Sequence, residues 1–315
     1  MTAHGILNLL KPQGMTSMDA VRRVKRLTRE RSVGHGGTLD PLATGVLPVL
    51  FGQATRVMDI LIEGRKVYRG VVRLGITTDT YDVTGRVLAT ADPSGVSQEQ
   101  VGAVLQRFLG TITQVPPAYS ALKQEGEPLY RRARRGEEVQ PKPRRVRVFR
   151  LDILAWTPPT FVLEIECGRG VYIRSLAHDI GQALGCGAAL EALERLQAGP
   201  FRIEDGIALD AFAQAVAEGT WKSLLYPPDY VVRHLKAAIL GPGAARLASQ
   251  GQDIPLGRRG LLLAQHGELC RLYTQDGRFL ALARYDSSKG RWHPEKVFNP
   301  PLEEGEQAIA SPAGP

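Results

Sequence analysis

The sequence predicts a larger α+β domain followed by a small β domain. Strand and helix patterns alternate over the first 230 or so residues, without the regular strand–helix–strand order of a doubly wound sheet. After a linker at residues 226–229 the pattern changes to short strands and turns, among them the hairpin signal Asp276-Gly277. We therefore expect domains at residues 1–230 and 231–302. The polar segment 303–315, rich in Ala and Pro, is expected to be disordered.

Short apolar runs and helix-capping residues place the first elements of the larger domain. Residues 5–10 have a strand pattern, and Thr16-Ser17 can cap the helix that follows. Residues 66–74 alternate between apolar and polar side chains, as in a half-buried strand. Ser97 and Gln100 form a capping-box pattern before a second amphipathic helix.

Later elements are expected around a glycine-containing turn. Residues 161–167 have a strand pattern, Gly168-Arg169-Gly170 forms the turn, and residues 171–173 continue as a second strand. Residues 175–184 then have a helical pattern. In the small domain, strand patterns lie at residues 261–263, 269–273 and 279–285.

Composition favours a nucleic-acid partner and a reducing compartment. The chain has 315 residues and a net charge of +8, which suits a polyanionic partner, although an ordinary basic enzyme would fit equally well. Its three cysteines, Cys167, Cys186 and Cys270, lie far apart in the sequence and indicate neither a disulfide framework nor a zinc site. The amino terminus lacks a signal-peptide pattern, and no apolar run reaches membrane-spanning length. We expect a cytoplasmic protein without a metal site or a membrane segment.

A basic segment is predicted at about residues 124–150. Eight arginines and one lysine lie between Arg131 and Arg150, together with two prolines. This density is typical of an exposed insertion that binds phosphate groups, and a solvated charged hairpin is the alternative.

One carboxylate, Asp40, lies in a long glycine-rich loop that Pro41 stiffens. A simple surface turn is the alternative, but such a turn does not need so long a loop between apolar segments. A glycosidase would need a second carboxylate, and a phosphate-binding loop would need a lysine after the glycines. The pattern therefore favours a single carboxylate that acts as nucleophile or base.

A carboxylate in such a site needs a cationic partner, because burial alone would neutralise it. Arg174 is the best candidate, since it lies where a strand pattern changes to a helical one. Taken alone, an arginine at such a position is more often a surface residue.

Several motifs carry a family resemblance. The loop Gly34-His35-Gly36-Gly37-Thr38-Leu39-Asp40-Pro41-Leu42-Ala43-Thr44-Gly45 resembles the active-site signature of the TruB-type tRNA pseudouridine-55 synthases, although Gly36 stands where Thr or Ala is more usual. Val171-Tyr172-Ile173-Arg174 resembles the Tyr-Ile-Arg motif of that family, and Lys11-Pro12-Gln13-Gly14 its amino-terminal motif. Thr78-Asp79-Thr80-Tyr81-Asp82 resembles its acidic loop, which adds no obvious chemistry. The matches follow the family order from about residue 5 to residue 201.

The resemblance implies roles for seven residues. Asp40 would be the catalytic nucleophile, Arg174 its ionic partner, and Tyr68 the aromatic residue that packs on the target base. The implied substrate-binding residues are His35, Tyr172, Leu193 and Lys11.

The resemblance also implies a fold and a reaction. The fold would be a pseudouridine-synthase catalytic domain with a mixed, mainly antiparallel sheet flanked by helices, followed by a PUA-like RNA-binding domain. The reaction would isomerise uridine-55 in the T-loop of tRNA by base flipping, without a cofactor, in a monomer that needs no protein partner. Two alternatives stay open. One is a guide-RNA-dependent pseudouridine synthase, and the other is an RNA chaperone that folds tRNA.

Overall fold

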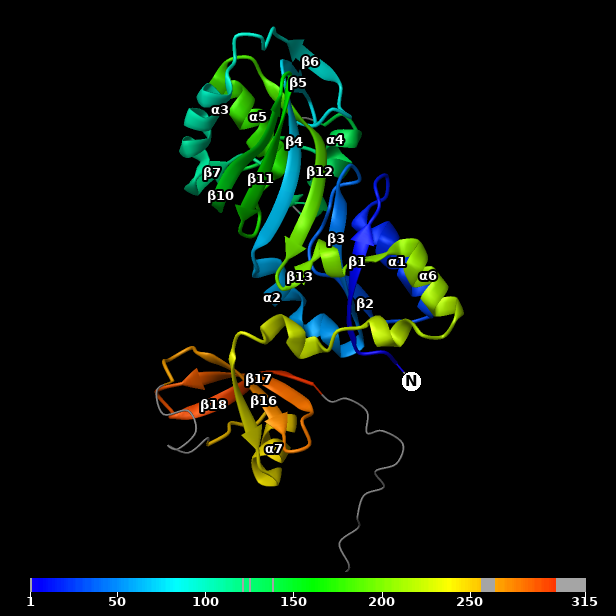
Figure 1. The fold of residues 1–315 in the computed structure, drawn as a ribbon. Coiled ribbons are helices and arrows are strands. Elements are labelled where there is room, and N and C mark those ends of the chain that lie inside the picture. The colour runs from blue at the N-terminus through cyan, green and yellow to red at the C-terminus, as the bar shows by residue number, and fades with distance from the viewer. Residues whose placement is uncertain (1, 121, 125, 138, 256–263, 299–315) are drawn as a thin grey trace, which may run out of the picture. The chain divides into compact units, whose positions relative to one another are not determined.

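The computed structural model describes residues 2–120, 122–124, 126–137, 139–255 and 264–298 (Figure 1). It contains two compact units. The larger unit comprises Leu7–Leu50 and Met58–Leu225, and the smaller unit comprises Tyr226–Pro315 with Met1–Ile6 and Phe51–Val57. The expected strand at residues 261–263 and the expected tail at 303–315 lie outside the described residues.

A ten-stranded sheet forms the larger unit, and most of its strands run in the order β14-β1-β3-β12-β4-β11-β10-β7. The strands are β1 (Gly5–Lys11), β3 (Thr44–Phe51), β4 (Lys66–Leu74), β7 (Gly110–Gln114), β10 (Arg144–Thr157), β11 (Thr160–Cys167), β12 (Ala188–Ala198) and β14 (Ile207–Ala208), with β2 (Val33–His35) beside β3 and β13 (Phe201–Arg202) beside β12. Strand β12 is parallel to β3 and antiparallel to β4, and β11 is antiparallel to both β4 and β10. The expected mixed, mainly antiparallel sheet is confirmed.

Helices and two short hairpins complete the larger unit. The helices are α1 (Ser17–Thr28), α2 (Met58–Glu63), α3 (Gln98–Leu105), α4 (Leu129–Arg134), α5 (Ile173–Leu184) and α6 (Leu209–Ala217), and the hairpins are β5 (Ile76–Thr78) with β6 (Val87–Thr90) and β8 (Lys123–Gln124) with β9 (Glu127–Pro128). Helices α3 and α5 lie on one side of the sheet, whereas α1 and α6 lie together near β1 (Figure 1). The expected capping box at Ser97 is present, and Thr16 caps the first helix as expected, there too with a capping box.

The expected strand at residues 171–173 is wrong. After β11 the chain turns at Gly170, which has a φ of +86°, and α5 begins at Ile173. Tyr172 has extended backbone angles, but it is the helix N-cap and pairs with a side chain. Its N–H donates to Gln114 Oε1 (2.8 Å) and its carbonyl accepts from Gln114 Nε2 (3.0 Å), so one glutamine replaces a partner strand.

The segment expected as a basic insertion has two parts. Arg144 begins β10, so the residues from 144 onward belong to the main sheet. Before it, Arg135 pairs with Glu127 and Glu137 at 2.6 and 2.7 Å, and Arg132 pairs with Glu137 at 2.8 Å. Part of the positive charge in this segment is therefore neutralised locally.

A four-stranded sheet, in the order β15-β16-β17-β18, forms the core of the smaller unit. Its elements are β15 (Lys236–Leu240), α7 (Pro242–Ser249), β16 (Leu269–Thr274), β17 (Phe279–Asp286) and β18 (Arg291–Val297). The hairpin turn expected at Asp276-Gly277 joins β16 to β17, and Gly277 takes a φ of +86° there. Buried Trp292 belongs to one core cluster with Leu272 and with Ala248 of α7. The small β domain is confirmed.

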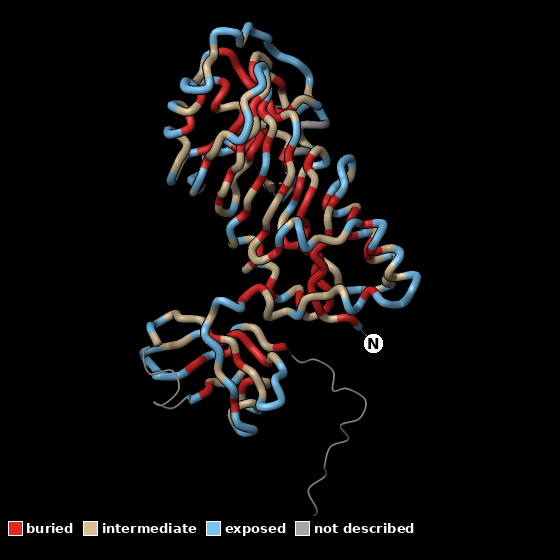
Figure 2. Tube along the Cα trace, viewed as in Figure 1, coloured by how far each residue is buried: buried red, intermediate tan, exposed pale blue. Residues whose placement is uncertain are grey.

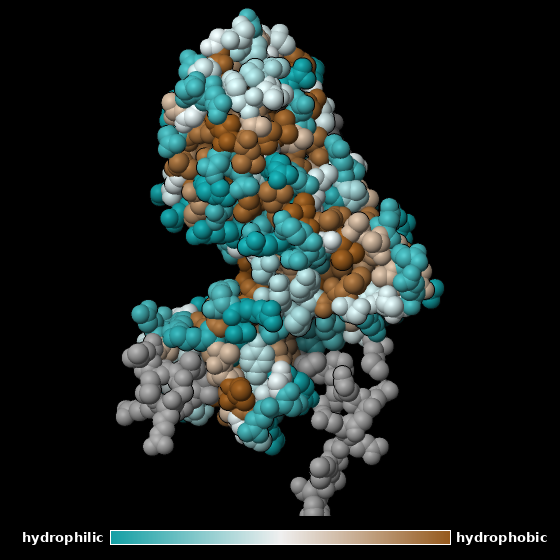
Figure 3. All heavy atoms as spheres, viewed as in Figure 1, coloured by the Kyte–Doolittle hydropathy of each residue, from teal (hydrophilic) through white to brown (hydrophobic). Residues whose placement is uncertain are grey.

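The two faces of the main sheet differ in chemistry. Along β4, Lys66, Tyr68 and Leu74 are buried on one face, whereas Arg69 and Arg73 are exposed on the other (Figure 2). Hydrophilic side chains cover much of the region of β4, β10 and β11 in the view of Figure 3. None of the helices in the described part of the chain has the length and apolar character needed to cross a bilayer.

We predict opposite effects for two glycine-to-alanine substitutions in helices. A Cβ at Gly181 in α5 would lie 2.0 Å from the backbone nitrogen of Ala188, so Gly181→Ala should destabilise the fold by about 1–3 kcal/mol. A Cβ at Gly102 in α3 would meet nothing within 4 Å, so Gly102→Ala should stabilise by up to about 1 kcal/mol. Urea unfolding measures both changes. Equal effects would contradict the close approach of α5 to β12.

Candidate active site

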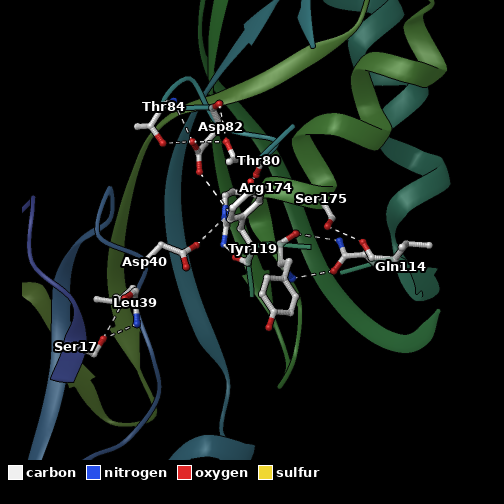
Figure 4. Close-up of polar contacts among 12 residues, drawn as sticks. Ser17, Leu39, Asp40, Thr80, Asp82, Thr84, Gln114, Tyr119, Arg174 and Ser175 are labelled. Carbon is white, nitrogen blue, oxygen red and sulfur yellow. Dashed lines mark hydrogen bonds and ion pairs between the residues drawn. The ribbon is translucent and has the colours of Figure 1, made fainter. Parts of the chain in front are cut away.

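The loop that carries Asp40 connects β2 to β3 and is fixed by its neighbours. Leu39 is buried, and its N–H donates to Ser17 Oγ (2.8 Å), which donates in turn to the Leu39 carbonyl (3.1 Å; Figure 4). The N–H of Gly14 donates to the Pro41 carbonyl at 2.8 Å. Because the residues on both sides of it are anchored, Asp40 is held in a set position.

An arginine of β12, Arg195, binds the backbone of the same loop and of the strand that follows it. It is 1% exposed, and its guanidinium donates to the carbonyls of Val46 (2.6 Å), Gly37 (3.0 Å) and Thr38 (3.4 Å). The backbones of Gly45 and Arg195 lie close together because Gly45, with a φ of +96°, has no Cβ. A Cβ at Gly45 would lie 2.3 Å from the Arg195 carbonyl oxygen. Arg195 did not emerge from the sequence, although its two-residue spacing from Leu193 on β12 places both on the same face.

Arg174 and Asp40 form an ion pair at the start of α5. Arg174 Nε donates to Asp40 Oδ2 at 2.8 Å. The arginine side chain is 5% exposed and the carboxylate side chain 33% exposed, so the pair is buried on one side only. Arg174 also donates to the carbonyls of Thr80 (3.1 Å) and Tyr119 (3.0 Å), which fixes the plane of its guanidinium.

A second carboxylate, Asp82, supports Arg174 from the opposite side. Asp82 Oδ2 lies 3.5 Å from Arg174 Nη1, and the Asp82 side chain is 7% exposed. Its other oxygen accepts from Thr80 Oγ1 (2.9 Å), Thr84 Oγ1 (2.5 Å) and Thr84 N–H (3.0 Å). The sequence indicated an acidic loop here without obvious chemistry, and in the structure this loop places the Asp82 carboxylate against the Arg174 guanidinium.

A cavity of about 310 Å³ opens beside Asp40. Asp40, Tyr68, Tyr172 and Leu193 line it, together with Lys66. Tyr68 is 9% exposed, and burial raises the pKa of its hydroxyl, which keeps the phenol neutral. Aromatic and aliphatic walls with one carboxylate suit a flat, partly polar ligand.

Two expected substrate-binding residues, His35 and Lys11, are not among the described residues that line this cavity. The pKa of His35 is lowered, mainly because the side chain is buried. The Nδ1 atom of His35 is buried without a hydrogen-bond partner among the described residues. Lys11 is 1% exposed, and its ammonium group donates to the carbonyls of Pro12 and Met15, both at 2.8 Å. Lys11 therefore stabilises the turn before α1 through these two hydrogen bonds.

Comparison with known proteins places this geometry in a family. Residues 25–173 match the model for the TruB family pseudouridylate synthase N-terminal domain, and residues 174–235 match that for the tRNA pseudouridylate synthase B C-terminal domain. A protein of Dehalococcoides mccartyi named tRNA pseudouridine synthase B is 40% identical over 95% of this chain and 97% of its own length. The chain belongs to the TruB family of pseudouridylate synthases. A Pseudomonas aeruginosa relative named tRNA pseudouridine synthase B is 42% identical over 93% of this chain and 95% of its own length.

Solved structures share the TruB-family fold. The crystal structure of a Cbf5-Nop10-Gar1 complex matches with a TM-score of 0.72 and 28% identity, over 95% of this chain and 86% of that chain. An H/ACA RNP bound to a substrate RNA containing 2′-deoxyuridine matches with a TM-score of 0.71 and 26% identity, over 94% and 86% of the two chains. Like the rest of its family, this TruB-type protein is an isomerase that makes pseudouridine.

Within the described residues, no group of three or more His, Cys, Asp or Glu side chains is placed to hold a metal ion. Cys167, Cys186 and Cys270 are free and buried, and burial raises the pKa of Cys167 to about 12.

We predict that Lys11 gives the stability of this TruB-type protein a measurable pH dependence. Burial is the main cause that lowers the pKa of Lys11 from 10.5 to about 8; Asp40 opposes the shift and Arg195 adds to it. Below pH 8 the cost of burying the charge is fully present. As the pH rises from 8 to 10.5, the folded state releases the proton before the unfolded state does, so stability rises by at most about 1.4 kcal/mol per pH unit.

Lys11→Met lacks this ionisation, so comparison of the two proteins isolates it. The difference in the free energy of unfolding, measured by urea titration at pH 7.5, 9 and 10, should shift in favour of the wild type as the pH rises. Ionisations that both proteins share, such as those of Tyr68 and Cys167, cancel in the difference. A difference that does not change with pH would show that Lys11 is buried without a lowered pKa.

Proposed function

We propose that this enzyme isomerises uridine-55 in the T-loop of tRNA to pseudouridine, that Asp40 initiates the reaction, and that no cofactor takes part. The observation that carries the proposal is the Asp40 carboxylate, held by Arg174 at 2.8 Å and facing a cavity lined by Tyr68 and Leu193. The tRNA substrate is supported by the names of relatives that are 40–48% identical. The position in the T-loop rests on the resemblance of the Asp40 loop to the family signature.

The target uridine must leave its base stack to react. The cavity lies within one unit of the protein, and its volume is near the lower end of the range of ligand pockets, roughly 300–1,000 Å³. Tyr68 and Leu193 offer an aromatic and an aliphatic wall to a flipped uracil. Recognition then combines the shape of the folded RNA loop with contacts to one extruded base.

The reaction rearranges bonds without net oxidation or transfer to another molecule. The bond between ribose C1′ and uracil N1 breaks, the uracil rotates, and a bond forms between C1′ and C5. The proton on C5 is lost and N1 ends with a hydrogen, so the product is an isomer of the substrate. Asp40 either attacks C1′ or abstracts a ribose proton; both steps need the charged carboxylate, which the Arg174 guanidinium stabilises.

The cavity must hold the detached uracil until it recombines. Tyr68 and Leu193 are 9% and 8% exposed, so they restrict the access of water to the base. The neutral phenol of Tyr68 is able to donate a hydrogen bond to the base or ribose.

Two other functions lead to different outcomes with purified protein. A guide-RNA-dependent synthase would need an added RNA and protein partners. Of the solved neighbours named above, one is an RNP bound to a substrate RNA and the other is a complex of Cbf5, Nop10 and Gar1. An RNA chaperone would act on tRNA without modifying it. We propose instead a monomeric cytoplasmic enzyme that acts alone, because the described smaller unit forms its own β sheet and core.

Mapping of pseudouridine on an unmodified tRNA transcript tests the proposal. The wild-type protein alone, with no cofactor added, should produce a single pseudouridine in the T-loop. Asp40→Asn should reduce the rate by about 10³-fold or more, because it removes the reacting carboxylate. The affinity for tRNA should stay within a fewfold, since one carboxylate contributes little beside many phosphate contacts.

The outcomes separate the candidates. Product formed only when guide RNA and partner proteins are added would favour the guide-dependent function. Tight binding with no product under either condition would favour the chaperone. A large loss of binding in Asp40→Asn would mean that the residue supports the structure of the RNA site rather than the chemistry.

We predict that two groups of arginines differ in their effect on RNA binding. Arg26 in α1 and Arg31, in the segment that follows the end of α1, are exposed, and they make no ion pair with a described residue. The 12-residue helix α1 begins at Ser17, beside the Asp40 loop, and extends about 18 Å, which allows it to follow an RNA stem. By contrast, Arg65 and Arg69 on the open face of the sheet pair with Glu166 (2.7 Å) and Glu194 (3.4 Å).

The double variant Arg26→Ala/Arg31→Ala should weaken tRNA binding and lower the slope of log affinity against log salt by about two, one for each phosphate that the variant no longer neutralises. The matched variant Arg65→Ala/Arg69→Ala should change the slope much less, because those charges are already paired. Filter binding at several salt concentrations measures both. Equal slopes for the two variants would remove α1 from the RNA interface.

A further inference from the structure

The turn that carries Asp82 contains an unusual residue. Tyr81 has a φ of +64° and is one of two non-glycine residues with positive φ in the described part of the chain. The other, Arg29, is the C-cap of α1, a common place for that conformation. A left-handed backbone is unfavourable at a residue with a bulky side chain, so surrounding contacts must hold it.

An aromatic stack is the contact that holds Tyr81. Its ring lies on the imidazole of His178, with 4.0 Å between ring centroids and 17° between ring planes. Burial lowers the pKa of His178, and its Nδ1 is buried without a partner among the described residues. The stacked imidazole is therefore neutral and packs through its face rather than through hydrogen bonds to its Nδ1. The Tyr81 carbonyl adds an anchor by accepting from the N–H of Leu190 at 3.0 Å.

The neighbours of Tyr81 both act on Arg174. The Thr80 carbonyl accepts from Arg174 Nη1 at 3.1 Å, and Asp82 Oδ2 lies 3.5 Å from the same nitrogen. His178 and Arg174 are four residues apart on α5 and thus share one face of the helix. The left-handed residue bends the chain so that residues 80, 81 and 82 all contact that face.

We propose that the Tyr81–His178 stack is a positioning clamp for Arg174 and, through it, for Asp40; this inference rests on the proposed function. The clamp keeps the strained turn closed, and the turn supplies the Thr80 carbonyl as an acceptor and the Asp82 carboxylate as an ion-pair partner to Nη1 of Arg174. With that edge occupied, Nε is directed at Asp40. Without the rings, the turn can relax, and the guanidinium and the carboxylate lose their fixed alignment.

A series of substitutions separates the rings from the backbone. Tyr81→Gly keeps the left-handed conformation available but removes the ring, and His178→Ala removes the other ring. Tyr81→Phe and His178→Phe each retain a ring that is able to stack. The measurements are the single-turnover rate of pseudouridine formation on a tRNA transcript, the Kd for tRNA, and the melting temperature.

We expect Tyr81→Gly and His178→Ala to slow the single-turnover rate by about tenfold while the Kd for tRNA stays unchanged, because alignment rather than binding is impaired. Both Phe variants should recover the rate to within about twofold. As a control, Tyr285→Ala in the smaller unit removes a ring that packs on Trp292, with 5.2 Å between ring centroids; it should lower the melting temperature without slowing the reaction.

Rates within twofold of wild type for both ring deletions would overturn the clamp, as would Phe variants as slow as the deletions. A loss of rate that follows the melting temperature across all variants, including Tyr285→Ala, would indicate a structural role only. Failure of the proposed function would look different, because the wild-type protein itself would then form no T-loop pseudouridine.

Discussion

The buried guanidinium of Arg174 is the group on which the site depends. Removing such a charge from water costs several kcal/mol unless acceptors surround it. Its acceptors come from three places far apart in the sequence: the Asp40 loop, the turn at residues 80–82, and the Tyr119 carbonyl. Each of these irregular segments therefore has a reason to lie where it does. The same bonds that satisfy the arginine bring these segments together at the cavity.

Two buried arginines, Arg174 and Arg195, stabilise different parts of the Asp40 loop. Arg195 donates to three carbonyls at the ends of the loop and thus fixes its backbone. Arg174 makes its short bond to the carboxylate and fixes the direction of the side chain. A guanidinium suits both tasks because it carries five donors in a rigid plane, which a lysine lacks. The backbone of the loop and the Asp40 carboxylate are thereby positioned by separate contacts.

Local patterns predicted much of this arrangement, whereas long-range contacts were out of reach. The alternation in β4 and the caps at Thr16 and Ser97 depend on neighbours in sequence, and they were confirmed. The start of α5 was misread because a β-branched, aromatic run favours a strand until Gln114, 58 residues away, takes the backbone bonds of Tyr172. Arg195 was missed for the same reason, since its partners lie about 150 residues earlier.

The charge balance around Asp40 connects the site to its polyanionic substrate. A lone exposed carboxylate would repel the phosphates that flank an extruded nucleotide. Here Arg174 pairs with it directly, and the buried charges of Lys11 and Arg195 add positive potential from beneath the loop. The cavity also has Lys66 and Arg144 among its lining residues. One negative charge is thus surrounded by several positive ones, so the opening is able to attract the phosphates of RNA despite the Asp40 carboxylate.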